Sequence, residues 1–113
     1  RVLFRSTGET PESAKAKQLD VKIAKFPFAA NGRAISMDET TGFIRLISDT
    51  ATHGLLGAQI VGPSASDLIS ELSLAIENGL TTNDISLTIH PHPTLGEAIM
   101  DTAELADGLP IHI

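Results

Sequence analysis

Cysteine is absent from this chain of 113 residues, so disulfides, thiolate metal ligands and cysteine nucleophiles are all excluded. The formal net charge is -6 and there is no basic run, which argues against a nucleic acid or an anionic membrane as partner. No apolar run approaches the ~20 residues that a membrane helix needs. The phosphate-binding patterns G-x-G-x-x-G and the P-loop are also missing, so the chain is not expected to hold a dinucleotide by those routes.

The composition is that of an ordinary soluble fold. An apolar fraction of 42% and a charged fraction of 19% suit one compact domain that buries its own core. The chain opens on Arg1 without the pattern of a signal peptide, and its only methionines are Met37 and Met100. We therefore expect a fragment, a processed form or an incomplete sequence. The lack of cysteine is compatible with a cytoplasmic protein.

Three segments have the pattern of strands. Residues 21–28 begin with strand-like alternation, and Pro27 puts their far end at an edge or a bend. Residues 42–48 and 55–61 are apolar runs joined by a turn-rich loop, so we expect them to pair as an antiparallel hairpin. Asn31-Gly32 predicts a turn.

The helical signals lie mainly in the second half of the chain. Residues 10–18 predict a short helix with Thr10 as N-cap and Pro11 at its first position. A longer helix is predicted by helical spacing of apolar residues, with Gly79 as its stop, and its stripe is Leu68, Ile69, Leu72, Ala75 and Ile76. That stripe is either core or in part a contact with a partner subunit.

Two further helices complete the prediction. One is capped by Thr82 or Asn83 and passes through Ile85 and Ile89; the other opens at Thr94. Strands early and helices late predict an α+β fold, an antiparallel β-sheet with helices packed on one side.

The densest chemical feature is residues 90–97, which read His-Pro-His-Pro-Thr-Leu-Gly-Glu. Two prolines exclude a helix, so a rigid bend should hold His92 in a defined direction. Glu97 could reach back to one ring nitrogen of His92, which is the arrangement of a general base with its orienting carboxylate. The alternative is a capping box, in which Glu97 bonds the backbone of Thr94. The two roles are compatible.

Other interpretations of His90 and His92 remain open at this point. Both could be exposed loop residues, or they could form part of a metal site, since residues two apart face one way on a strand. Zinc usually takes three or four protein ligands, and neither His53 in the hairpin loop nor His112 at the tail is an obvious third. We therefore predict no metal.

Three blocks in the right order resemble the flavin-dependent pyridine nucleotide-disulfide oxidoreductases. The block at 90–97 is similar to their C-terminal motif H-x-H-P-T-x-x-E, and its doubled histidine is most like the dihydrolipoyl dehydrogenase branch. Residues 25–34 resemble the family's strand and turn, and residues 56–63 its hairpin strand. The end at 108–113 is similar to bacterial tails of that enzyme. The resemblance covers nearly the whole chain and identifies its C-terminal dimerisation domain.

The resemblance implies a specific activity for a longer protein. That protein would be a homodimer that oxidises dihydrolipoamide through a redox disulfide and FAD with reduction of NAD+, in the cytoplasm of a bacterium. FAD and NAD would be bound mainly by domains outside this chain, which alone would bind neither and would be inactive. The partners implied are the lipoyl domains of 2-oxoacid dehydrogenase or glycine cleavage complexes.

The resemblance also assigns residues to roles. His92 matches the acid-base that the domain lends to the partner subunit's site, and Glu97 matches its orienting carboxylate. His92 and Pro93 would lie against the partner's flavin, with a His92–Pro93 bond that can be cis. His90 and Thr94 are interpreted as structural support.

Two points depart from the simplest assignment. Residues 1–5 replace the family's proline-containing strand, so we predict an atypical junction at 1–6 and the dimerisation domain at 7–113. The rival functions are a stand-alone self-association module without catalysis, and the same domain from a glutathione- or mercuric-type reductase.

Overall fold

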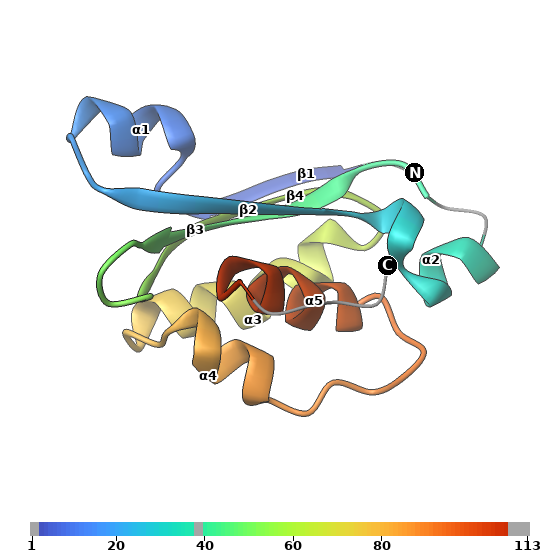
Figure 1. The fold of residues 1–113 in the computed structure, drawn as a ribbon. Coiled ribbons are helices and arrows are strands. Elements are labelled where there is room, and N and C mark those ends of the chain that lie inside the picture. The colour runs from blue at the N-terminus through green and yellow to red at the C-terminus, as the bar shows by residue number, and fades with distance from the viewer. Residues whose placement is uncertain (1–2, 38–39, 109–113) are drawn as a thin grey trace.

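The computed structural model describes residues 3–37 and 40–108, and it confirms the α+β class. A four-stranded antiparallel sheet in the order β1-β4-β3-β2 carries the helices of the second half of the chain on one face, and the first helix, α1, lies on the other side (Figure 1). The strands are β1 (Leu3–Gly8), β2 (Val21–Pro27), β3 (Phe43–Asp49) and β4 (Leu55–Gly62). The helices are α1 (Pro11–Ala16), α2 (Gly32–Ser36), α3 (Ala65–Glu77), α4 (Thr82–Leu87) and α5 (Glu97–Ala106), with a 3-10 turn at Phe28–Ala30.

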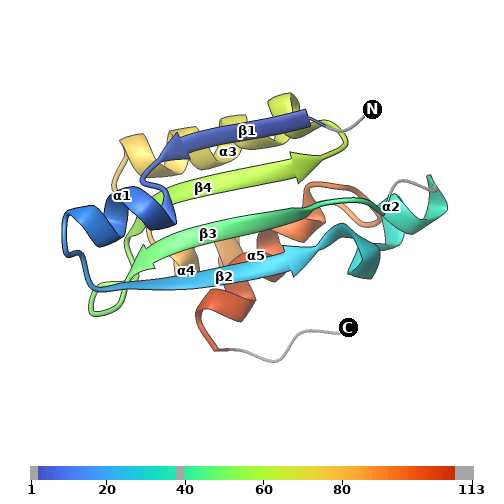
Figure 2. The ribbon, with the colours of Figure 1, turned by 90° about the horizontal axis from the view of Figure 1, so that it is seen from above.

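The hydrophobic core lies between the sheet and two of the helices. Helix α3 packs under β1 and β4, and α5 packs under β2 and β3 (Figure 2). Alternation along β3 turns Ile44 and Leu46 into this layer, where both are fully buried. The predicted stripe of α3 splits: Leu72 and Ala75 are buried, whereas the other members are partly buried against the core. Most of that stripe therefore belongs to the core, the first of the two interpretations of these residues.

The predicted hairpin forms from β3 and β4, with a bulge between Ile47 and Ser48. Its loop is organised by Asp49, whose carboxylate accepts hydrogen bonds of 2.9 Å from the backbone N–H groups of Ala51 and Thr52. These bonds, that of Thr52 first, lower the pKa of the Asp49 carboxyl because they stabilise its charged form. The hairpin loop is thus stabilised by hydrogen bonds between its own residues.

Residues 3–8 belong to the sheet. Strand β1 pairs with β4 over its whole length, from Leu3 opposite Gly62 to Gly8 opposite Gly57. The predicted boundary after residue 6 falls inside this strand. The amide nitrogen of buried Gln59 on β4 donates to the hydroxyl of Ser6 in β1 at 3.3 Å and to the carbonyl oxygen of Glu9, just after β1, at 2.9 Å. A proline-free segment is therefore able to fill the edge position.

Three helix boundaries differ from the sequence prediction. Asn31 is not merely a turn residue, because its side chain caps α2 by accepting from the N–H of Ala34. Helix α4 begins after Thr81, with a capping box to Asp84, and ends at Leu87, so Ile89 lies outside it. Helix α5 begins at Glu97 rather than Thr94. At α2 and α4 the difference comes from a polar side chain that binds the backbone locally. At α5 the turn before Glu97 has hydrogen bonds between residues three apart, which is 3-10 rather than α geometry.

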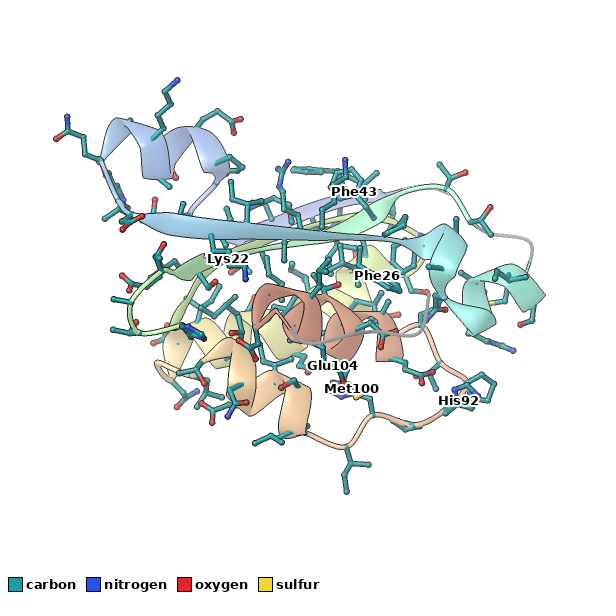
Figure 3. The ribbon with its side chains drawn as sticks, viewed as in Figure 1. Lys22, Phe26, Phe43, His92, Met100 and Glu104 are labelled. Carbon is teal, nitrogen blue, oxygen red and sulfur yellow. The ribbon has the colours of Figure 1, made fainter. Side chains whose placement is uncertain are left out.

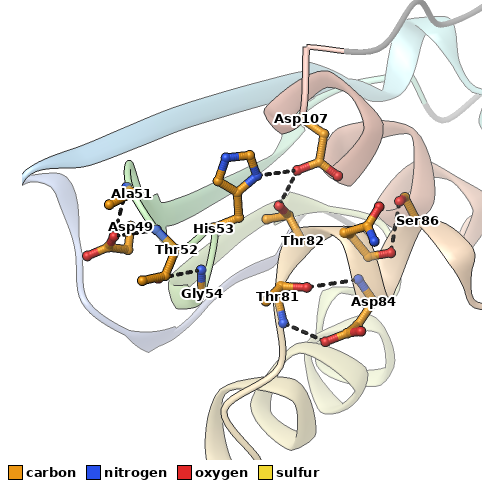
Figure 4. A network of polar contacts seen from close by, with 11 residues as sticks. Asp49, Ala51, Thr52, His53, Gly54, Thr81, Thr82, Asp84, Ser86 and Asp107 are labelled. Carbon is orange, nitrogen blue, oxygen red and sulfur yellow. Dashed lines mark hydrogen bonds and ion pairs between the residues drawn. The ribbon is translucent and has the colours of Figure 1, made fainter.

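A polar network closes the far end of the helical layer (Figure 4). Asp107, just after α5, contacts Nδ1 of His53 in the hairpin loop at 3.2 Å. The same carboxylate oxygen accepts a 2.5 Å hydrogen bond from the hydroxyl of Thr82, which is fully buried. Three elements distant in sequence are thereby joined through one carboxylate.

Replacing Thr82 with valine keeps the shape of the side chain and removes its hydroxyl. We expect the free energy of unfolding to fall by about 1–3 kcal/mol, the cost of losing a hydrogen bond from a buried hydroxyl to a carboxylate. Urea denaturation would measure this change. Thr50→Val, at an exposed loop position, is the matched control and should change stability by less than about 0.5 kcal/mol. Equal effects of the two substitutions would contradict the role given to this network.

Candidate acid-base site

The bend between α4 and α5 carries both histidines of the predicted motif. It is extended from Thr88 onward, and the peptide bond between His92 and Pro93 is cis, as the resemblance implied. The hydroxyl of Thr94 donates to the carbonyl of Pro91 at 2.6 Å, which closes the bend across its tip. Pro91, His92 and Pro93 are exposed. The segment therefore presents its tip to the outside while its two ends are fixed.

His92 and Glu97 are brought together as predicted. Nδ1 of His92 lies 2.8 Å from Oε1 and 2.9 Å from Oε2 of Glu97. A carboxylate accepts hydrogen bonds, so Nδ1 carries the hydrogen and Nε2 is left with its lone pair in the neutral ring. The side chain of His92 is 74% exposed whereas that of Glu97 is 17% exposed. The ring of His92 thus stands at the molecular surface (Figure 3). The Glu97 carboxylate that contacts it is mostly shielded from solvent.

Of the two hydrogen bonds of the predicted capping box, only the one to the Thr94 side chain is formed. The backbone N–H of Glu97 donates to the hydroxyl of Thr94 at 3.3 Å, so Thr94 helps to satisfy the start of α5. The carboxylate of Glu97 is instead directed at His92. Position in the first turn of α5 also suits a negative charge, because the helix dipole is positive there.

His90 has a different environment from His92. Its Nε2 lies 2.7 Å from Oε2 of Glu71 on α3, and its Nδ1 lies 2.8 Å from the carbonyl oxygen of Thr88. Only 6% of its side chain is exposed. Sequence reasoning did not find Glu71, since nothing in local spacing connects residues 19 positions apart on different elements. The support role predicted for His90 now has named contacts.

Asn31 is a second residue that sequence reasoning did not connect with the bend. It is 2% exposed, and besides capping α2 it donates from Nδ2 to the carbonyl oxygen of Thr94 at 3.0 Å. One amide therefore joins the start of α2 to the segment that follows His92. The only signal in the sequence was its place in the block at 25–34, which resembles the same family as the bend.

The metal alternative gains no support from the described part of the chain. There, no three side chains of His, Cys, Asp or Glu lie close enough to hold a metal ion. His90 and His92 contact different carboxylates on different helices. His53 contacts Asp107, and His112 lies outside the described residues.

No helix within residues 3–37 and 40–108 is long and apolar enough to cross a membrane.

Comparison with known proteins identifies the class. Residues 4–103 match the family model described as the dimerisation domain of pyridine nucleotide-disulphide oxidoreductases. The dihydrolipoyl dehydrogenase of Bacillus subtilis (strain 168) is 60% identical over 108 residues, which is 96% of this chain and 23% of that protein. The enzyme of the same name from Geobacillus stearothermophilus is 56% identical over the same shares. The chain spans less than a quarter of the length of these curated relatives.

Solved structures of related reductases contain the same fold. A HOCl-induced flavoprotein disulfide reductase from Escherichia coli superposes with a TM-score of 0.85 at 27% identity, covering 90% of this chain and 23% of that one. LpdA from Mycobacterium tuberculosis has the same fold, with a TM-score of 0.85 at 24% identity over 90% of this chain and 22% of its own. The chain belongs to the dimerisation-domain family of the pyridine nucleotide-disulphide oxidoreductases. Within that family it is a domain like those of the dihydrolipoyl dehydrogenases.

Replacing Asn31 with alanine should destabilise the domain through both bonds of its amide. The N–H of Ala34 and the carbonyl of Thr94 would lose their partner, and we expect the free energy of unfolding to fall by about 1–3 kcal/mol. Denaturant titration of the chain measures this. Asn78→Ala removes an exposed bond to the carbonyl of Leu74 at the end of α3 and should cost less. A smaller loss at Asn31 than at Asn78 would rule out the proposed link.

Proposed function

We propose that this domain dimerises a dihydrolipoyl dehydrogenase and lends His92 and Glu97, as an acid-base pair, to the site of the partner subunit. The observation that carries the proposal is the geometry of the pair: Nδ1 of His92 is held by both oxygens of Glu97 while the rest of the ring is exposed. Among the described residues, no hydrogen bond reaches Nε2 of His92. An orienting carboxylate with a free nitrogen opposite is the arrangement that a general base needs.

The proton transfer then follows from the hydrogen-bond roles. Nε2 takes the proton of a substrate thiol as the S–H bond breaks, and the thiolate attacks the enzyme's redox disulfide. The new S–S bond forms while the old one breaks, and the leaving sulfur departs as a thiolate. His92 then carries two N–H groups, and the Glu97 carboxylate stabilises the positive charge because it already accepts from Nδ1. The proton can be returned from Nε2 later in the cycle.

His90 is unsuited to this role. Both of its ring nitrogens already contact acceptors, and its side chain is almost fully buried. A base must have one nitrogen within reach of the substrate proton. The acid-base role is therefore assigned to His92 because its exposure and its uncontacted ring nitrogen distinguish it from His90.

The proposal places the cofactors in other parts of the longer protein. This chain has no dinucleotide-binding pattern, and what it offers a cofactor is the exposed tip at His92 and Pro93. Such a tip fits a contact with a flavin held by the partner subunit. When bound, FAD would relay an electron pair to NAD+ from the dithiol that forms when the substrate reduces the redox disulfide. The proposed substrates are lipoyl domains of 2-oxoacid dehydrogenase or glycine cleavage complexes.

The surface near the bend suits burial against a second copy of the domain. Ile89 is 92% exposed and Leu87 is 74% exposed, and both lie within five residues of His92. Leu74 on α3, one turn from Glu71, is exposed as well. Apolar side chains gathered at the surface of a soluble protein indicate contact with a partner. A dimer formed here would carry His92 into its own interface.

Replacing His92 with glutamine in the full-length flavoprotein should slow its reduction by dihydrolipoamide about 10²- to 10⁴-fold, the usual span for a lost acid-base group. Stopped-flow absorbance of the flavin measures that half-reaction. His53→Gln, in the exposed hairpin loop, is the matched control and should leave the rate unchanged. A wild-type rate in the His92→Gln protein would refute the acid-base assignment.

Replacing Ile89 with aspartate should weaken the dimer, because it places a charge in the proposed interface without a partner. Sedimentation of the full-length protein should then show a shift toward monomer on dilution. Ile23→Asp offers a matched control, since Ile23 lies on the sheet face that the helices leave open. An unaltered dimer in the Ile89→Asp protein would place the interface elsewhere.

A further inference from the structure

Glu71 contacts the bend from a helix that has no other part in the proposed chemistry. Its Oε2 lies 2.7 Å from Nε2 of His90, and the His90 ring is 6% exposed in that contact. We infer that Glu71 is a positioning residue for His92: its bond to His90 fixes the bend to α3. This inference rests on the proposed function of His92 and names a residue that lies outside the motif at 90–97.

The hydrogen bonds of His90 show that Glu71 does more than pack beside it. The carbonyl of Thr88 can only accept, so Nδ1 must donate to it. Nε2 faces a carboxylate oxygen, which leaves one proton shared between His90 and Glu71. Every polar atom of the ring is thus used, and its orientation is fixed from two directions. A nearly buried histidine would otherwise leave a ring nitrogen without a partner, which is costly.

The position of this contact along the chain explains its effect on His92. The bend is fixed before His92 by the Glu71–His90 bond and after it by the Asn31–Thr94 bond. These bonds reach α3 and the N-cap of α2, two elements that are distant from the bend in sequence. His92 sits between them, with its ring held by Glu97. Removal of the first attachment frees the segment that leads into His92.

Loss of Glu71 should therefore affect proton transfer more than folding. A displacement of about 1 Å in a reacting group can reduce a rate about 10²-fold. We expect Glu71→Ala, in the full-length flavoprotein, to slow reduction by dihydrolipoamide about 10- to 100-fold. Reduction of the flavin by NADH, which does not use His92, should keep its wild-type rate. Glu71→Gln retains an acceptor oxygen for Nε2 and should recover most of the loss.

A double variant separates positioning through His92 from a general defect. In a His92→Gln background, Glu71→Ala should cause no further loss, because the group that it positions is already gone. An equal loss in both backgrounds, or slower reduction by NADH, would overturn the inference. Glu77→Ala, an exposed position at the end of the same helix, should leave both half-reactions unchanged.

The same set of variants distinguishes the two proposals. A wild-type rate in Glu71→Ala together with a slow His92→Gln protein would overturn the positioning role and leave the acid-base assignment standing. A wild-type rate in His92→Gln would refute the acid-base assignment itself, and the inference about Glu71 would fall with it.

Discussion

The packing of α5 against β2 and β3 is the constraint on which the site depends. Alanines and an isoleucine on one face of α5 are buried against the sheet, which fixes the helix axis and its first residue. Glu97 is that first residue, so a carboxylate at a rigid helix start determines where His92 can stand. Helix starts are suited to this task because the dipole stabilises the charge that the histidine needs as partner.

Two histidines in one motif acquire opposite properties from their surroundings. His90 is buried and gives both nitrogens to fixed acceptors, whereas His92 is exposed and gives only one. Each meets a carboxylate from a different helix, so the difference lies in exposure and in the second nitrogen rather than in charge. One residue type thus has two different environments only two positions apart in the same bend.

The fold could be predicted from the sequence because its signals are local. The hairpin, the long helix and the His92–Glu97 pair all follow from spacing within a few residues, and the structure has each of them. The contacts of Glu71 and Asn31 could not be predicted, since they join residues 19 and 63 positions from their partners. The helix end at Ile89 was wrong because Thr88 is already extended and its hydroxyl binds the carbonyl of Asp84. The helix start at Thr94 was wrong because the turn before Glu97 has hydrogen bonds between residues three apart.

The proposed sharing of a site between subunits favours a bend that is rigid before the partner arrives. If the bend were ordered only on dimerisation, its ordering entropy would reduce the affinity of the dimer. Here attachments to α2, α3 and α5 fix the bend within one chain, and the apolar residues beside it remain at the surface. The domain can then contribute apolar contact area to association while the direction of His92 is already determined. The same helix, α5, thus supplies both buried core residues and the Glu97 carboxylate that contacts His92.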